Sequence, residues 1–204
     1  LIHSKSISQR KLIDLESKDK CFNVALVGRL EEVKRPLFLF KILHKISLNK
    51  NQKIKIYFGG DGNMRSNLIE KINEFNLLNK NKLNINIEYL GFIDRTQLLD
   101  LISITNLYIN TSYSEGCLVT AMEFLSNPFC NILLPDVKSI KDIYECKRSF
   151  FYPIQNEKFL LELFKYNLDN FYNICKKESR FIYPVEFEDF ILENSSKILI
   201  DLYL

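Results

Sequence analysis

The stretch NVALVG at residues 23–28 is a short run of β-forming residues that ends in a glycine. Segments with helical periodicity separate it from further β-rich runs at residues 54–58, 85–90, 107–110, 130–134 and 150–152. Strands that alternate with helices are typical of an α/β domain with a mainly parallel sheet. We therefore expect an α/β fold in which helices flank such a sheet.

Two of the intervening segments carry an apolar stripe at positions i, i+3, i+4 and i+7, as helices packed on a sheet do. Pro36 suits the first turn of the earlier helix, where a missing N–H is harmless. Asn127-Pro128 predicts the end of the later helix, with Asn127 in the left-handed cap role. The stripes are Leu39, Ile42, Leu43 and Ile46, and Leu118, Ala121, Met122 and Leu125.

The chain has 204 residues, 47% of them hydrophobic, and can therefore form one domain with a sizeable core. We expect a charged lead-in over residues 1–20, the α/β domain over 21–184 and a final helix over 185–204. The net charge is only +3, and acidic and basic residues are mixed along the chain, so the sequence shows no basic patch for nucleic-acid binding. No run approaches the length of a membrane-spanning helix, so we expect a cytoplasmic protein, with peripheral membrane contact left open.

Histidines and cysteines exclude other classes of site. The two histidines, His3 and His44, are too few for a histidine metal site or a Ser-His-Asp triad. The five cysteines include no CxxC pair, which favours a reducing compartment. We therefore expect no metal and no cofactor.

Glycines gather where the predicted strands end. Gly28, Gly59-Gly60 and Gly91 each close a strand, and Gly116 follows the strand at 107–110 by a short loop. In parallel sheets the ligand crevice lies at the carboxyl ends of the strands, where glycine lets amides approach a phosphate. A nucleotide crevice at this edge and ordinary turn chemistry both stay open at this point.

The loop GRLEEVK at residues 28–34 places two cations five positions apart. Arg29 offers a planar fork and Lys34 a point charge, and both suit a diphosphate. The alternative is a pair of solvated loop cations that are neutralised by Glu31 or Glu32.

The segment SYSEGCLVTAME at residues 112–123 places one glutamate before a predicted helix and another eight positions later. Free amides around Gly116 to Val119 form an anion site at the helix N-terminus. A rise of about 1.5 Å per residue separates Glu115 and Glu123 by about 12 Å, too far for a glycosidase pair. They suit the two ends of one ligand, with a sugar at Glu115 and a ribose at Glu123. Alternatively, Glu115 interacts with the helix dipole and Glu123 is solvated.

Four motifs in order give a family resemblance: residues 28–34, FGGDG at 58–62, YLGFI at 89–93, and Glu115-x7-Glu123. Together they resemble the family-4 (group 1) retaining glycosyltransferases of the GT-B fold. The resemblance implies a Rossmann-like domain that forms the C-terminal, donor-binding half of that fold. Residues 1–20 then lead in from an N-terminal domain that this chain lacks, and residues 185–204 resemble the crossover helix.

The resemblance also implies roles for individual residues. Arg29 and Lys34 contact the donor diphosphate, Glu115 contacts the transferred sugar as the catalytic residue, and Glu123 contacts the nucleotide ribose. Backbone groups at Phe92-Ile93 contact the base. The donor-binding set is completed by Gly28, Gly60, Gly116, Cys117, Leu118 and Val119.

The implied reaction transfers a hexose from a nucleotide sugar to a saccharide or lipid-linked acceptor, with retention and without a metal. It fits bacterial surface polysaccharide or glycolipid assembly at the inner face of the cell membrane. The chain alone is expected to be inactive, because its N-terminal GT-B domain supplies the acceptor side.

Two departures from the family pattern accompany these motifs. Leu118 stands where the family often has glycine or proline, and residues 136–139 replace a common Gly-Gly pair. A sugar-nucleotide epimerase of the GT-B type and a non-catalytic nucleotide-sugar-binding or scaffold module are the alternatives.

Overall fold

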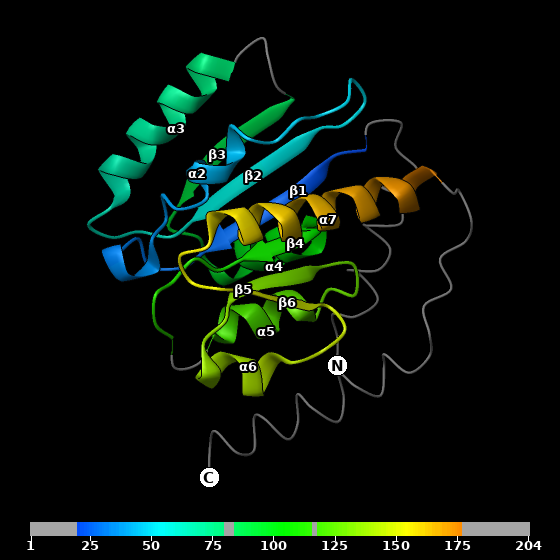
Figure 1. Ribbon diagram of the computed structural model, residues 1–204. Coiled ribbons are helices and arrows are strands. Elements are labelled where there is room, and N and C mark those ends of the chain that lie inside the picture. The colour runs from blue at the N-terminus through cyan, green and yellow to red at the C-terminus, as the bar shows by residue number, and fades with distance from the viewer. Residues whose placement is uncertain (1–19, 80–83, 116–117, 177–204) are drawn as a thin grey trace.

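The computed structural model describes residues 20–79, 84–115 and 118–176 (Figure 1). The expected lead-in, apart from Lys20, and the expected final helix over 185–204 lie outside these residues. Six strands form one sheet in the described part of the chain. They are β1 (Phe22–Val27), β2 (Ile54–Gly59), β3 (Ile85–Gly91), β4 (Leu107–Ile109), β5 (Asn131–Pro135) and β6 (Ser149–Tyr152).

The sheet has the strand order β3-β2-β1-β4-β5-β6, and every neighbouring pair is parallel. The chain moves outward from β1 to β3 and then returns to the other side of β1 to form β4. This is a Rossmann-like order, and its switch point lies between β1 and β4. The predicted α/β class and all six predicted strands are confirmed.

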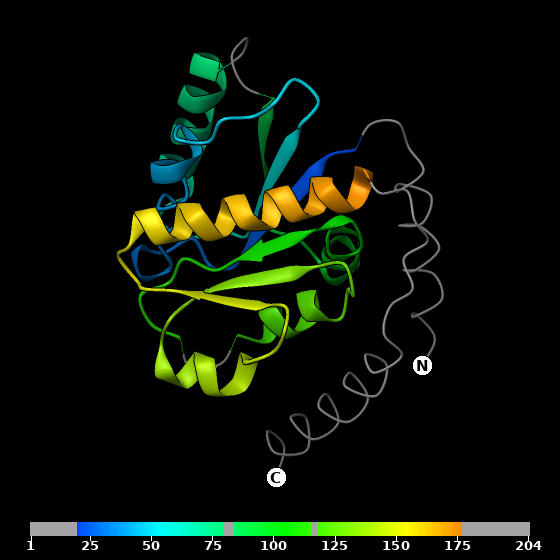
Figure 2. The ribbon, with the colours of Figure 1, turned by 45° about the vertical axis from the view of Figure 1, so that its right-hand side comes forward.

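Helices cover both faces of the sheet, so the molecule has three layers (Figures 1 and 2). Alternation along each strand explains the two faces, because Val24 packs in one hydrophobic cluster and Ala25 in the other. On one face lie α2 (Phe40–Leu43), α3 (Arg65–Asn79) and α7 (Glu157–Lys176). On the other face lie α4 (Arg95–Ile104), α5 (Val119–Leu125) and α6 (Lys138–Tyr144).

The first predicted helix is shorter than its apolar stripe indicates. All four stripe residues are buried, but only Phe40–Leu43 is α-helical, and the 3-10 turn η1 (Glu32–Lys34) precedes it. The turns around α2 use mainly i→i−3 hydrogen bonds, such as Phe38 N–H to the Arg35 carbonyl at 3.0 Å. This tighter winding interrupts the α-helix while still burying the stripe.

The predicted left-handed cap at Asn127 was wrong. Among the described residues, Arg35 is the only non-glycine with a positive φ. Asn127 is fully buried, and its side-chain amide donates to the carbonyls of Ile102 and Thr105 at 2.6 and 3.1 Å. Asn127 therefore supplies hydrogen-bond donors to carbonyl groups at the end of α4. This role does not require a left-handed backbone at Asn127.

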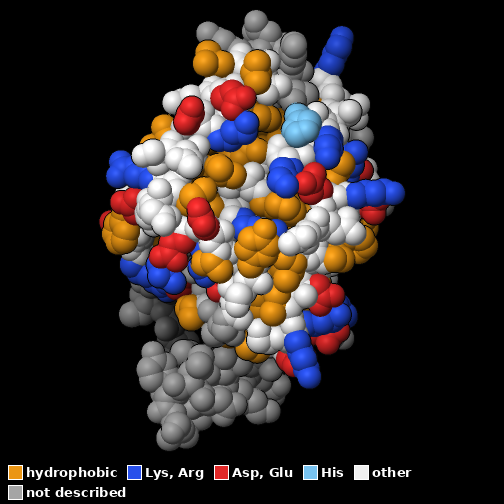
Figure 3. Space-filling view, turned by 60° about the vertical axis from the view of Figure 1, so that its left-hand side comes forward, with side chains coloured by type: hydrophobic (Ala, Val, Ile, Leu, Met, Phe, Trp, Pro, Cys, Tyr) orange, Lys and Arg blue, Asp and Glu red, His pale blue; other side chains and the backbone are white. Residues whose placement is uncertain are grey.

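The visible surface in Figure 3 mixes acidic and basic side chains around a band of hydrophobic ones. It has no large area of a single charge sign. Within the three described segments, no helix is long and apolar enough to cross a membrane.

Candidate functional site

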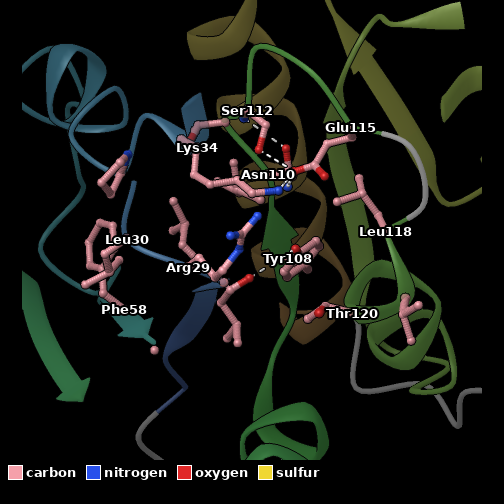
Figure 4. A pocket seen from close by; sticks show the side chains of 18 residues that line it. Arg29, Leu30, Lys34, Phe58, Tyr108, Asn110, Ser112, Glu115, Leu118 and Thr120 are labelled. Atoms are coloured by element: carbon pink, nitrogen blue, oxygen red, sulfur yellow. Dashed lines mark hydrogen bonds and ion pairs between the residues drawn. The ribbon is translucent and has the colours of Figure 1, made fainter. Parts of the chain in front are cut away.

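A cleft of about 290 Å³ opens at the carboxyl ends of β1 and β4 (Figure 4). This is the switch point of the sheet, where parallel α/β folds bind their ligands. The predicted site residues that line the cleft are Gly28, Arg29, Lys34, Glu115, Leu118 and Val119.

Lys34 and Glu115 form an ion pair inside this cleft, although 81 positions separate them in sequence. The Lys34 Nζ lies 2.5 Å from Glu115 Oε1. The same oxygen accepts hydrogen bonds from Ser112 Oγ at 2.5 Å and from Asn110 Nδ2 at 3.3 Å, as Figure 4 shows. We call Lys34, Asn110, Ser112 and Glu115 the inner cluster.

The inner cluster is sheltered from water. Only 6% of the Glu115 side chain and 23% of the Lys34 side chain are exposed. A carboxylate in such a place needs its cation and its donors, because burying an unpaired charge is costly. The site therefore holds a cation and a carboxylate at the positions that the motifs predicted, and it adds two neutral donors.

Hydrogen bonds join the two loops that carry this ion pair. The Thr111 hydroxyl lies 2.8 Å from the Lys34 carbonyl and 2.9 Å from the Arg35 carbonyl. The Tyr113 N–H donates to the Val33 carbonyl at 2.9 Å. The loop after β1 and the loop after β4 are thus held together on both sides of Lys34.

Arg35 completes this connection. Its guanidinium donates to the carbonyls of Thr111 and Ile154 at 2.6 and 3.1 Å, and it lies between the rings of Phe38 and Tyr113, 4.1 Å from each centroid. The residue is buried and left-handed, with φ 46° and ψ 54°. A left-handed backbone costs a non-glycine residue about 1–2 kcal/mol, so these contacts must hold it there.

The sequence analysis missed Arg35 and the two donors of the inner cluster, and for Arg35 no sequence signal exists. Arg35 is one of many basic residues, and its bonds reach residues 76 and 119 positions away. Asn110 and Ser112 follow β4 directly, so their position at the carboxyl edge was a usable signal.

Tyr152 lies next to the inner cluster in the packed molecule. Its hydroxyl donates to the Asn110 carbonyl at 2.9 Å, and burial raises the pKa of this hydroxyl.

The predicted edge glycines that the structure describes come together at the carboxyl ends of β1, β2 and β3, and two of them, Gly28 and Gly59, line the cleft. Gly28 N–H donates to Gly59, and Gly60 N–H donates to Gly91, at 3.0 and 2.7 Å. Gly60 has φ 129°, and a Cβ there would lie 1.9 Å from the Gly28 carbonyl oxygen. Gly60 therefore has to be glycine for the β1 and β2 turns to pack this closely.

Arg29 lies at the open side of the cleft. Its side chain is 73% exposed, and its Nη1 contacts Glu31 Oε1 at 2.9 Å. The structure thus has the local pairing that was the alternative for this residue. Arg29 nevertheless lines the same cleft as Lys34.

Glu123 lies outside the lining of the cleft. Its carboxylate on α5 pairs with the guanidinium of Arg95 at the start of α4. Of the predicted base-contacting residues, Phe92 is 77% exposed, and Ile93 lies against Gly59. We use the name outer cluster for the ion pair of Arg95 and Glu123 together with Phe92-Ile93, which precede α4 in the sequence. Arg95 was missed because its pairing depends on α4 and α5 sharing a face of the sheet.

The predicted amide site before α5 is partly occupied by the protein itself. The Leu118 N–H donates to the Tyr144 hydroxyl at 3.0 Å, and α5 begins only at Val119, whose side chain is exposed. Gly116 and Cys117 lie outside the described residues. Over the described ranges, no group of histidine, cysteine, aspartate and glutamate could hold a metal ion.

Comparisons with known proteins show the family of the chain. Residues 9–145 match the family of glycosyl transferases group 1. A search among curated protein sequences finds no match.

Solved structures share the fold at low sequence identity. The catalytic domain of cholesterol-alpha-glucosyltransferase from Helicobacter pylori is 19% identical, with a TM-score of 0.59 over 86% of this chain and 98% of that one. A glycosyltransferase from Rickettsia africae is 15% identical, with a TM-score of 0.61 over 95% and 48%. Anabaena HepE, in complex with UDP and glucose, is 14% identical, with a TM-score of 0.56 over 98% and 52%. The chain thus spans about half the length of the last two.

Proposed function

The chain belongs to the group 1 glycosyl transferases, and from this premise we propose that its cleft binds the nucleotide-sugar donor of a retaining hexosyl transfer. One observation carries the proposal. A cation and a carboxylate from distant segments, Lys34 and Glu115, converge in the cleft at the switch point of the sheet. They supply the two kinds of group that a sugar diphosphate needs.

The diphosphate is assigned to the cationic side of the cleft. Lys34 supplies a point charge and Arg29 a planar fork, and both line the cleft. In a metal-free transfer these cations stabilise the negative charge that develops on the leaving diphosphate.

The sugar is assigned to Glu115. A carboxylate accepts hydrogen bonds only, so it suits vicinal hydroxyl groups. Ser112 and Asn110 hold one of its oxygens, Oε1, in a defined place. The other oxygen, Oε2, has no bond to these two side chains, and we assign it to a sugar hydroxyl.

The nucleoside is assigned to the outer cluster. Glu123 accepts the ribose hydroxyls, and backbone groups at Phe92-Ile93 contact the base. Because Glu123 pairs with Arg95, the ribose has to replace that guanidinium or bind beside it.

Two solved structures with the same fold suggest which donors to try first. Anabaena HepE is described in complex with UDP and glucose, and the pneumococcal O-GlcNAc transferase in complex with UDP and GlcNAc. The second is 18% identical to this chain. UDP-glucose and UDP-GlcNAc are therefore the first ligands to test, with GDP and ADP sugars beside them.

The acceptor is proposed to bind between this domain and a second, N-terminal GT-B domain. Effective molarity lowers the barrier by roughly 7–11 kcal/mol only when donor and acceptor are both positioned. We accordingly expect the 204-residue chain to bind donor without transferring it. We propose that the acceptor is a saccharide or a lipid-linked molecule. The transfer would then take place at the cytoplasmic face of a membrane, in surface polysaccharide or glycolipid assembly.

Ligand-observed NMR of the purified chain with nucleotide sugars tests donor binding. Lys34→Ala should lose the saturation-transfer signal of the donor. Lys71→Ala should keep it, because Lys71 lies on α3 and pairs with Glu74 on the surface. Equal signals from all three proteins would contradict the assignment of the cleft.

A radiolabelled donor assay tests the transfer itself. We expect transfer to the acceptor only when an N-terminal GT-B domain is added, in cis or in trans. Acceptor-dependent transfer by the chain alone would contradict the two-domain part of the proposal. Release of a free epimerised sugar nucleotide would indicate that the protein is an epimerase. Donor binding without any turnover, even with the N-terminal domain, would indicate a binding module.

A further inference from the structure

The two charges of the inner cluster neutralise each other. Glu115 is the ion-pair partner of Lys34 in the described part of the chain, at 2.5 Å. Any phosphate that binds Lys34 therefore competes with the Glu115 carboxylate, which already contacts the Lys34 ammonium group. The exposed pair of Arg29 and Glu31 offers far less competition, because water solvates both of its charges.

Removing Lys34 from the pair has a cost that depends on the ligand. Glu115 would keep only Ser112 and Asn110 as donors, with 6% of its side chain exposed. A buried carboxylate without its cation is strongly destabilised. A ligand that brings hydroxyl groups to Glu115 lowers this cost, whereas a bare diphosphate does not.

The loops cannot relieve the competition by moving apart. Thr111 and Arg35 bind across them, and the Tyr113 N–H closes the other side. Lys34 must therefore leave Glu115 by rotation of its own side chain, which is long and flexible. The exchange of partners is a side-chain event inside a fixed frame.

We propose that the Lys34–Glu115 pair makes the cleft select the complete nucleotide sugar against the free nucleotide. The diphosphate takes Lys34, and the sugar hydroxyls replace Lys34 at Glu115. This inference rests on the proposed function and deepens it. It also has a consequence after transfer: once the sugar has left, Lys34 returns to Glu115, which weakens the hold on the nucleoside diphosphate and favours product release.

Inorganic pyrophosphate tests the exchange without any assumption about the nucleotide or sugar. Glu115→Gln should tighten its binding about tenfold, a factor at the lower end of what a charge-assisted hydrogen bond supplies. Glu32→Gln is the matched control, because it removes the same charge at an exposed site, in the loop after β1 that carries Lys34. It should change the affinity less than about twofold. Isothermal titration calorimetry measures both.

The double variant Lys34→Ala/Glu115→Gln shows whether the gain acts through Lys34. We expect the gain to disappear in it. A gain of equal size in Glu32→Gln, a gain that survives in the double variant, or no gain in either Glu115→Gln or Glu115→Ala would each overturn the exchange. If the amide introduced by Glu115→Gln still holds Lys34, or if that variant folds poorly by circular dichroism, Glu115→Ala repeats the measurement with the same expected direction.

UDP and UDP-glucose test the selectivity. The dissociation constant of UDP divided by that of UDP-glucose should fall at least about tenfold in Glu115→Gln. UDP should bind this variant more tightly, whereas the sugar of UDP-glucose loses its hydrogen-bond acceptor. An unchanged ratio would overturn the selection. If no variant binds any nucleotide sugar while the pyrophosphate results hold, the donor-binding function fails and the exchange stands. If donors bind but the pyrophosphate gain is absent, the exchange fails and the function stands.

Discussion

The inner and outer clusters each contain one predicted glutamate and one cation, but the fold treats them differently. Glu115 is buried, and its partner Lys34 comes from a loop that is hydrogen-bonded to the loop of Glu115. Glu123 is 22% exposed, and its partner Arg95 is 64% exposed. Similar charges thus form a restrained pair in one place and a solvated pair in the other. The strength of each pair depends on its surroundings rather than on its residue types.

The largest effect is expected where the backbone of Gly60 packs against that of Gly28, at the ends of β2 and β1. Gly60→Ala should lower the free energy of unfolding by about 3 kcal/mol or more, because a Cβ clashes with Gly28 and φ is positive. Gly28→Ala is the control, since a Cβ there meets nothing within 4 Å. Urea unfolding measures both, and equal losses would show that the close approach at Gly60 does not limit stability.

The next effect separates the two loops of the inner cluster. Arg35→Ala should cost about 2 kcal/mol, since it removes two hydrogen bonds and two ring contacts. Arg35→Gly should cost about 1 kcal/mol less, because glycine tolerates the left-handed backbone. Urea unfolding measures the difference, and a glycine variant less stable than the alanine variant would contradict the strain at this position.

Hydrogen exchange localises the same change. In Arg35→Ala the Tyr113 amide, which bonds to Val33, should exchange faster. The Leu98 amide, which bonds to Asp94 beside the outer cluster, should change only as much as the whole protein does. Uniform acceleration of both amides would mean that Arg35 stabilises the fold without holding the loops.

A smaller effect concerns the exposed cation of the cleft. Arg29→Ala should weaken UDP binding about tenfold and leave uridine binding within about twofold, because the guanidinium acts on phosphates alone. Calorimetry with the two ligands measures this. Arg65→Ala is a matched control, since Arg65 is an exposed arginine that pairs with Asp61 outside the cleft lining. Equal losses for UDP and uridine would exclude a phosphate role.

The smallest effect is expected at the outer cluster. Arg95→Ala should change the free energy of unfolding by less than about 0.5 kcal/mol, since exposed ion pairs contribute little. Because it frees Glu123, it should leave UDP affinity unchanged or raise it about twofold. Thermal unfolding and calorimetry measure the two quantities. A clear loss of UDP affinity would place Arg95 itself on the ligand and would revise the role of Glu123.

Local patterns were enough to predict the strands, although not their order in the sheet. All six strands appear within two residues of their expected ends, because β-rich runs and closing glycines are short-range signals. The first helix was overestimated, since an apolar stripe reports burial and cannot distinguish i→i−3 from i→i−4 bonding. The left-handed residue was expected at Asn127 and occurs at Arg35, whose guanidinium binds carbonyl groups of distant segments.

The sequence by itself determined the fold class and the family, and it predicted the carboxyl edge of the sheet, where the cleft opens. These follow from the spacing of residues along the chain, which can be read from the sequence without any knowledge of contacts. Only the tertiary structure decided that Lys34 meets Glu115, that Arg95 meets Glu123, and that Arg35 joins the loops. Each of these contacts links segments at least 28 positions apart. Their partners are selected by the strand order and by which helices share a face, and both are properties of the packed molecule.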